Sequence, residues 1–264
     1  GASLFQSVSP IISDSTCAIN CEDPGYRLMT QVIDGETTTR EYIIHVPSGY
    51  QEGDNLPLVI VYHGFGGCAY YMVEETGGLN DLANEENFFV AYPQAAYRPE
   101  KEDTYWEPGF NGGESIYLDD IFFSEQLIEH IDEEFSLDLS RVYAAGYSNG
   151  GMLTYSLACL RGDLFAGVCV MSGALLDGID SCDPAQPVPM IIFHGTGDFV
   201  LPYNGDQYYA SVPDVVSLWT DHFQIPTSTL TSTDLNGGNV VHDSYHGGTN
   251  NTCLSLYTVI EEYG

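Results

Sequence analysis

The segment at residues 141–155, RVYAAGYSNGGMLTY, changes character at its centre. Its first part, residues 142–145, is a short apolar run typical of a buried strand, whereas the apolar residues of positions 152–160 recur at helical spacing. The two patterns meet at a Gly-x-Ser-x-Gly sequence centred on Ser148. So sharp a turn strains the backbone of the serine, and it needs glycine on both sides to let the neighbouring chain pass. The segment therefore predicts a strand, a tight turn and a helix.

Ser148 stands at the amino end of the expected helix. Backbone amides at such an end point toward the turn and stabilise negative charge that develops there. This placement is typical of the nucleophilic serine of a hydrolase. The alternative is a glycine-rich turn with an inert serine, and the strand and helix patterns on its two sides favour the nucleophile.

Apolar runs and helix-like segments alternate along the rest of the chain. Buried strands are expected at residues 56–62, 88–92, 165–171, 189–193 and 254–260, and helices at residues 78–87, 119–135 and 211–223. Two further runs, residues 28–33 and 40–46, flank Asp34 and Gly35 and predict an antiparallel hairpin at a sheet edge. We therefore expect one α/β domain over residues 1–264, with a mostly parallel central sheet flanked by helices and residues 1–27 as an N-terminal extension.

Glycine-rich sequences follow two of the expected strands. The run at residues 56–62 ends in His63-Gly64-Phe65-Gly66-Gly67. Its three glycines free the backbone to turn amides toward a bound oxyanion, so the N–H groups of Phe65 and Asn149 are candidates for an oxyanion hole. A glycine-rich turn without a ligand is the alternative. We expect His63 to orient this loop rather than to act as a base.

The run at residues 189–193 ends in HGTGD, whose last residue is Asp198. The acid of a catalytic triad belongs just beyond such a strand, because it must reach a histidine at the same edge of the sheet. Asp198 is therefore the candidate acid, and His194 is expected to support the loop. Asp206 competes with it, but Asn204 and Gly205 beside Asp206 suit a turn.

A long loop rich in Gly, Pro, Tyr and Trp is expected at residues 93–115. Loops at the carboxyl ends of parallel strands build the ligand crevice, so Tyr105 and Trp106 are candidate substrate-binding residues for an aromatic group or a sugar ring. Ordinary packing of the loop is the alternative. His242 and His246 are four positions apart without a helix to align them, so no metal site is predicted.

The charge of the chain excludes some partners. Six Lys and Arg against 38 Asp and Glu give a formal net charge of −32, which repels nucleic acids and anionic membranes. No apolar stretch approaches the length of a membrane span, and the first ten residues lack the basic start and apolar core of a signal peptide. The charge leaves the oligomeric state open.

Seven cysteines are scattered along the chain without a Cys-x-x-Cys pair, which favours disulfides over a zinc site. We expect a secreted or periplasmic protein with up to three bridges and one free thiol. Cys169, inside an apolar run, is the candidate for the free thiol.

Three of these motifs, HGFGG, GYSNGGM and HGTGD, together resemble one family. It comprises secreted α/β-hydrolases related to polyhydroxybutyrate depolymerases and to the feruloyl and acetylxylan esterases of carbohydrate esterase family one. The resemblance runs over residues 40–264. It implies a serine esterase without a cofactor, with Ser148 as nucleophile, Asp198 as acid, the amides of Phe65 and Asn149 as oxyanion hole, and feruloyl or acetyl esters of plant polysaccharide as substrates. A polyester depolymerase and a noncatalytic binder of polysaccharide or polyester are the alternatives, and a serine peptidase of this fold is a weaker one.

The resemblance also implies where the catalytic histidine lies. In that family the last strand leads into a glycine-rich turn, and the histidine, a Trp-Pro pair and a closing helix follow. Here residues 254–260 correspond to the strand and residues 261–264 to the turn, so the histidine is expected directly after Gly264, and the closing helix is not among residues 1–264. His246 follows Ser148 and Asp198 and so keeps the chain order Ser, Asp, His. It precedes the final strand, however, whereas the base belongs after that strand. Loss of the base alone lowers turnover by about 10⁴- to 10⁶-fold.

Overall fold

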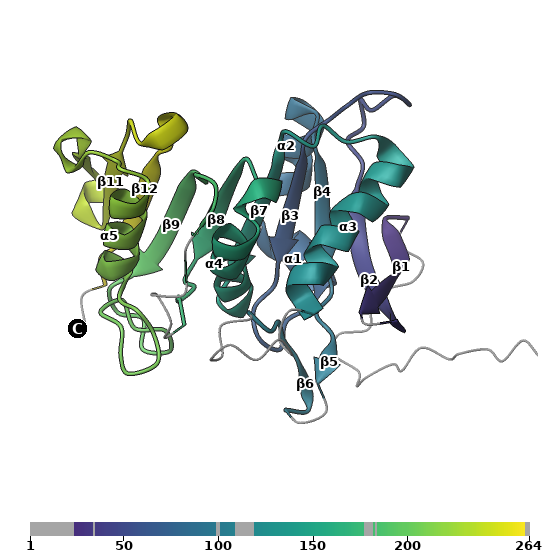
Figure 1. Ribbon diagram of the computed structural model, residues 1–264, viewed down its shortest axis with the longest axis horizontal. Coiled ribbons are helices and arrows are strands. Elements are labelled where there is room, and N and C mark those ends of the chain that lie inside the picture. Colours follow the sequence, from purple (N-terminus) through teal and green to yellow (C-terminus); the bar gives the residue numbers. More distant parts are fainter. Residues whose placement is uncertain are drawn as a thin grey trace, which may run out of the picture.

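The computed structural model describes residues 24–33, 35–98, 101–108, 119–176, 182 and 184–261, which are built around one large sheet (Figure 1). Its strands lie in the order β1-β2-β4-β3-β7-β8-β9-β12-β11-β10. The bounds of these strands are β1 Tyr26–Ile33, β2 Glu36–His45, β3 Leu58–Tyr62, β4 Phe89–Pro93, β7 Val142–Tyr147, β8 Gly167–Met171, β9 Met190–Gly195, β10 Thr231–Leu235, β11 Val240–Tyr245 and β12 Leu254–Val259.

The six central strands, from β4 to β12 in the order above, run parallel to one another. In β3 four of the five side chains of LVIVY are buried, which explains why this run is continuously apolar rather than alternating. At one edge β1 and β2 form an antiparallel hairpin in which Ile33 faces Glu36. Gly35 lies in the hairpin turn with φ of 85°, a conformation that favours glycine. The predicted parallel sheet and N-terminal hairpin are both confirmed.

Helices cover the two faces of the sheet (Figure 1). On one face lie α3 (Asp119–Phe135), α4 (Asn149–Leu160) and α5 (Val212–His222). On the other, α1 (Ala69–Glu75) and α2 (Leu79–Glu86) pack beside β3 and β4. The larger hydrophobic core lies on the α3–α5 side and a smaller one under α1 and α2. No helix in the described part of the chain combines the length and apolar character needed to cross a membrane.

The structure also contains elements that the sequence did not predict. Strands β10 and β11 extend the sheet antiparallel beyond β12, and β5 (Tyr97–Arg98) pairs with β6 (Asp103–Thr104) inside the long loop. Every residue of β10, TSTDL, is exposed. A strand held only by backbone hydrogen bonds at a sheet edge needs no apolar face, so its sequence shows no alternation.

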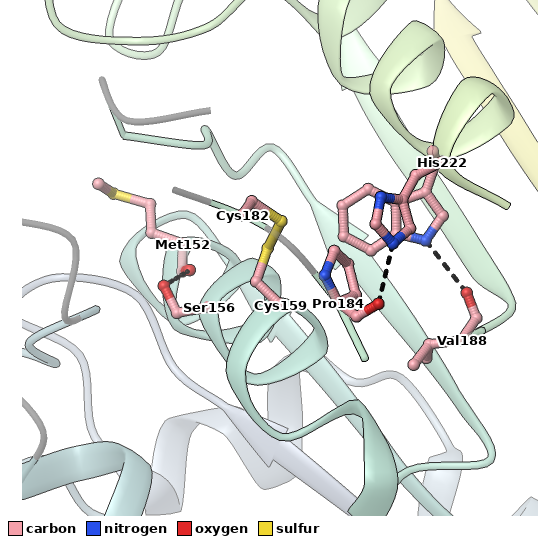
Figure 2. The surroundings of a disulfide bond; sticks show 8 residues. Met152, Ser156, Cys159, Cys182, Pro184, Val188 and His222 are labelled. Carbon is pink, nitrogen blue, oxygen red and sulfur yellow. Dashed lines mark hydrogen bonds between the residues drawn. A yellow bond between two sulfur atoms is a disulfide. The ribbon is translucent and has the colours of Figure 1, made fainter. Parts of the chain in front are cut away.

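A disulfide joins the end of α4 to the segment before β9. Cys159 is bonded to Cys182, and Figure 2 shows the bridge near Pro184 and His222. Cys68, Cys169 and Cys253 are free, which confirms the predicted free thiol at Cys169. Four of the seven cysteines then remain for pairing, which allows two bridges at most, so the expectation of one unpaired thiol is wrong.

The sheet explains why Cys169 and Cys253 are not bonded to each other. Cys169 is on β8 and Cys253 precedes β12, and β9 separates these strands. Two strand spacings, roughly 10 Å, exceed the reach of a disulfide. Cys17 and Cys21 lie outside the described residues.

Candidate active site

The predicted strand, turn and helix at Ser148 are all present. β7 ends at Tyr147, α4 begins at Asn149, and Ser148 between them has φ of 53° and ψ of −117°. A non-glycine residue in such a conformation costs about 1–3 kcal/mol, and sites of this kind cluster at active sites. The N–H of Ser148 donates to the carbonyl oxygen of Met171 at 2.9 Å, which fixes the turn to the end of β8.

Two glycines allow the turn to approach its surroundings. A Cβ added to Gly146 would overlap the backbone carbonyl of Gly150. A Cβ added to Gly150 would overlap the carbonyl oxygen of Tyr62 and lie 2.5 Å from that of His63. Both obstacles are backbone atoms of packed elements, so these positions accept glycine alone. Gly150 thereby brings Ser148 against the loop that follows β3.

This loop, residues 63–67, contains the N–H of Phe65, one of the two amides predicted for the oxyanion hole, and the other amide is that of Asn149. A Cβ added to Gly64 would lie 3.3 Å from the Cβ of Ser148, so the loop and the serine are neighbours. Asn149 is the first residue of α4, where a backbone N–H has no intrahelical acceptor. Within the described part of the chain, the N–H of Phe65 donates no hydrogen bond either. Two unengaged N–H groups therefore flank Ser148.

His63 fixes the loop at residues 63–67 through hydrogen bonds of both ring nitrogens. Its Nε2 accepts a hydrogen bond from the N–H of Ala95 at 3.1 Å, which leaves Nδ1 as the donor to the carbonyl oxygen of Gly64 at 2.7 Å. Burial lowers the pKa of His63 to about 4, against the weaker opposing effect of the bond to Gly64. A neutral, fully engaged imidazole positions the loop, as its sequence context predicted.

This buried imidazole makes stability depend on pH. The folded pKa of about 4 lies below the ordinary value of 6.5, so between these pH values the unfolded chain takes up more protons. The contribution of His63 is complete above pH 6.5 and is lost as the pH falls toward 4. Urea unfolding should show wild type losing about 3 kcal/mol relative to a His63→Gln variant between pH 7 and pH 4. A difference that stays flat over this range would contradict a buried neutral His63.

Asp198 lies in the loop after β9, two strands along the sheet from the serine. Its Oδ1 accepts hydrogen bonds from the N–H groups of Val200 and Leu201, both at 2.9 Å, which orient the carboxylate. The competing Asp206 caps its own turn, because its Oδ1 accepts from the N–H groups of Tyr208 and Tyr209. Because β7, β8 and β9 end in step, Ser148 and the Asp198 loop share one edge of the sheet, separated by roughly 10 Å.

No histidine bridges this gap. All seven histidines of the chain lie within the described residues, and none is hydrogen-bonded to Ser148 there. His194 lies 3.6 Å from Oδ2 of Asp198, but it is buried and its Nε2 is 2.8 Å from the carbonyl oxygen of Leu201. His246 is bonded through Nε2 to Oγ of Ser244 at 2.7 Å, at the end of β11.

The last described residue passes close to the acid. The N–H of Glu261 donates to Oγ1 of Thr196 at 3.1 Å. A Cβ added to Gly195 would lie 2.9 Å from Oε1 of Glu261, and one on Gly197 would overlap its other oxygen. The chain after β12 therefore runs directly beside the loop that carries Asp198.

The two aromatic residues predicted to bind substrate lie in different environments. Tyr105 is partly exposed and stacks on Phe65, with ring centroids 5.4 Å apart and 18° between the planes. Phe65 itself is 54% exposed, so the pair presents aromatic surface next to the serine. Trp106, by contrast, is 0% exposed. Its predicted contact with substrate is corrected, since alternating side chains of an extended segment point in opposite directions and Trp106 points into the core.

Sequence reasoning missed an ionic cluster beneath the loop. Asp120 is fully buried, and its carboxylate accepts from Arg40 at 2.8 Å and from Arg98 at 3.2 Å. Arg40 also lies over the ring of Phe123, with Cζ 3.7 Å from the ring centroid. The sequence offered one usable signal for this cluster. Arginine is rare in this chain, and pairing with a buried carboxylate is one reason for an arginine to be retained. Phe199, 87% exposed beside Asp198, was also missed.

The fold and the serine turn together define a class: the protein is an α/β-hydrolase. A family model described as "Putative esterase" matches residues 36–219, so the chain belongs to this esterase family. It is 33% identical over 171 residues to "Probable feruloyl esterase C" of Aspergillus terreus, a match that covers 63% of this chain. The chain spans 57% of the length of that curated relative.

Solved structures share the fold. The acetyl xylan esterase from Aspergillus awamori superimposes with a TM-score of 0.64 at 18% identity, over 89% of this chain and 93% of that one. A CE1 ferulic acid esterase from Anaeromyces mucronatus, solved in complex with ferulic acid, gives a TM-score of 0.56 at 20% identity, over 75% and 79%. These structures confirm the fold, and the family model and the feruloyl esterase relative confirm the resemblance to the esterase group predicted from the sequence.

Proposed function

We propose that the protein is an exported serine carboxylic-ester hydrolase that acts on feruloyl or acetyl esters of plant polysaccharide. The main support is the strained Ser148, flanked by the unengaged N–H groups of Phe65 and Asn149 and facing the same sheet edge as Asp198. The similarity to a feruloyl esterase and to an acetyl xylan esterase favours these acyl groups. The Cys159–Cys182 disulfide favours an oxidising compartment.

In the proposed reaction Oγ of Ser148 attacks the ester carbonyl and gives its proton to a histidine, while Asp198 orients that histidine. The developing oxyanion accepts hydrogen bonds from the N–H groups of Phe65 and Asn149. The alcohol leaves with the proton, and water then releases the acid from Ser148. The positive end of α4 adds to the stabilisation of the oxyanion.

We propose that the base is a histidine in polypeptide that follows Gly264. None of the seven histidines, all of which lie within the described residues, is hydrogen-bonded to Ser148. The hydrogen bond of Glu261 to Thr196 holds the end of the described chain beside the loop that carries Asp198. A histidine entering there would reach both Asp198 and Ser148 across the gap between β7 and β9.

The surface around the serine suits a neutral aromatic or sugar ester. Phe65 and Tyr105 on one side and Phe199 on the other offer flat apolar surface, and the net charge of −32 disfavours strongly acidic polymers. A polyester depolymerase would use the same surface and is the second candidate. A noncatalytic binder would have no need of the strained serine.

The chemistry is testable by covalent labelling. The protein as its source produces it should react with a fluorophosphonate probe, and mass spectrometry should place the label on the peptide containing Ser148. Rates on methyl ferulate, acetylated xylan and poly(3-hydroxybutyrate) should then rank the proposed substrates. Complete absence of labelling together with binding of polysaccharide would favour the noncatalytic binder.

A further inference from the structure

We propose that Trp106 is a positioning residue that fixes the two oxyanion amides relative to each other. Its side chain is fully buried, so it is not placed to touch a substrate. It does contact both elements that supply the amides, the start of α4 and the loop at residues 63–67. This role depends on Ser148 being the nucleophile proposed above.

The first contact is with α4. The N–H of Trp106 donates to Oδ1 of Asn149 at 2.7 Å, and Nδ2 of Asn149 donates to the carbonyl oxygen of Trp106 at 3.0 Å. The asparagine side chain thus pairs with the backbone of Trp106 through two bonds, as one strand pairs with another. Two parallel bonds fix orientation as well as distance. Fixing the side chain of Asn149 also fixes the position of its backbone N–H, which stays free to donate to an oxyanion.

The second contact is with the loop. Nε1 of Trp106 donates to the carbonyl oxygen of His63 at 2.8 Å, two residues before the amide of Phe65. The preceding residues add to this attachment, since Oγ1 of Thr104 donates to the carbonyl oxygen of Gly67 and its own carbonyl accepts from Gly66, both at 2.8 Å. The segment from Thr104 to Trp106 is therefore hydrogen-bonded along the whole loop.

The far end of this segment is anchored in the core. The N–H of Glu107 donates to Oδ2 of Asp120 at 2.8 Å, and Arg40 and Arg98 hold the same carboxylate. Asp120 is the second residue of α3, whose packing in the larger core gives the anchor a rigid base. The order of contacts runs from Asp120 through Trp106 to both amides.

The exact positions of the two oxyanion N–H groups matter for catalysis. An oxyanion donor is effective only near 3 Å from the developing charge, and removal of one donor lowers kcat by about 10²- to 10³-fold. Misplacement by about 1 Å costs about 10²-fold. Loosening the Trp106 contacts should therefore lower kcat, whereas ground-state binding should change little.

The test compares the two tryptophans of the chain. Trp106→Phe removes the indole N–H and keeps an aromatic ring. Trp219→Phe is the matched control, because Trp219 is also fully buried and its Nε1 donates to the carbonyl oxygen of Val188, a residue labelled in Figure 2, at 3.1 Å. With p-nitrophenyl acetate, Trp106→Phe should lower kcat about 10-fold or more and change KM less than 3-fold. Trp219→Phe should keep both constants.

A second readout separates positioning from stability. Phenylboronic acid forms a tetrahedral adduct with an active-site serine, so its Ki should rise in Trp106→Phe by the same factor as kcat/KM falls. Asn149→Ala, which removes the paired bonds, should behave likewise, and the double variant should lose less than the product of the two single losses. Titration with the fluorophosphonate probe counts the folded active sites, and every rate is expressed per labelled site.

Equal kinetics for Trp106→Phe and Trp219→Phe, or a kcat loss without a change in the Ki of phenylboronic acid, would overturn the positioning role. Failure of the proposed function gives a different result. If Ser148 is not the nucleophile, Ser148→Ala hydrolyses p-nitrophenyl acetate as fast as the parent.

Discussion

Ser148→Ala should lower kcat for p-nitrophenyl acetate by about 10⁶-fold in the protein as its source produces it. The reason is that the proposed mechanism passes through an acyl group on Oγ of this residue, and no other nucleophile is described within the turn. The side chain of Ser148 forms no capping hydrogen bond with α4, so its removal should leave the fold intact. Initial rates combined with circular dichroism measure both expectations.

Ser172 provides the matched control for this variant. It follows β8 at the same edge of the sheet, has a positive φ of 45°, and donates its N–H to the carbonyl oxygen of Phe193 at 2.8 Å. Ser172→Ala therefore imposes the same change in a similar backbone conformation, and its rate should stay within about twofold of the parent. A Ser148→Ala protein that retains the parental rate would reject the nucleophile and the esterase mechanism with it.

The part of the fold that could be predicted is the part encoded by local pattern. The apolar runs of β3 and β7 and the amphipathic pattern of α3 are properties of contiguous residues, and all three elements occur as expected. α5 begins after Ser211, whose Oγ accepts from the N–H of Asp214, as a capping serine does. Strand β10 has no such pattern, because all its residues are exposed and its backbone pairing with β11 alone makes it a strand.

The candidate site divides in the same way. Ser148, Asp198 and the loop at residues 63–67 were found because each follows a strand in a short glycine-rich sequence. The burial of Trp106 could not be read from its neighbours, since it depends on contacts with His63, Asn149 and the core under α3. Adjacent residues in an extended loop face opposite sides, and only the tertiary structure decides that Tyr105 faces outward.

Gly150→Ala should be among the most destabilising single substitutions in the described part of the chain. The new methyl group would lie 2.5 Å from the carbonyl oxygen of His63 and would overlap that of Tyr62. Tyr62 is the last residue of β3, which pairs with β4 and β7, so relief of the overlap must displace either the central sheet or the start of α4. We expect a loss of at least about 3 kcal/mol in the free energy of unfolding, measured by urea denaturation, and a parallel loss of esterase activity.

Gly167→Ala distinguishes this steric effect from the general cost of changing a strand or helix glycine. A Cβ added to Gly167 on β8 would lie 3.4 Å from the carbonyl oxygen of Pro189, an ordinary contact distance. The ordered backbone already suits alanine there, so the substitution should be neutral or stabilising by up to about 1 kcal/mol. If Gly150→Ala unfolds at the same urea concentration as Gly167→Ala, the close approach of α4 to the end of β3 is not what fixes glycine at this position. Ser148 would then owe its strained backbone to the hydrogen bond with Met171 rather than to the packing of the turn.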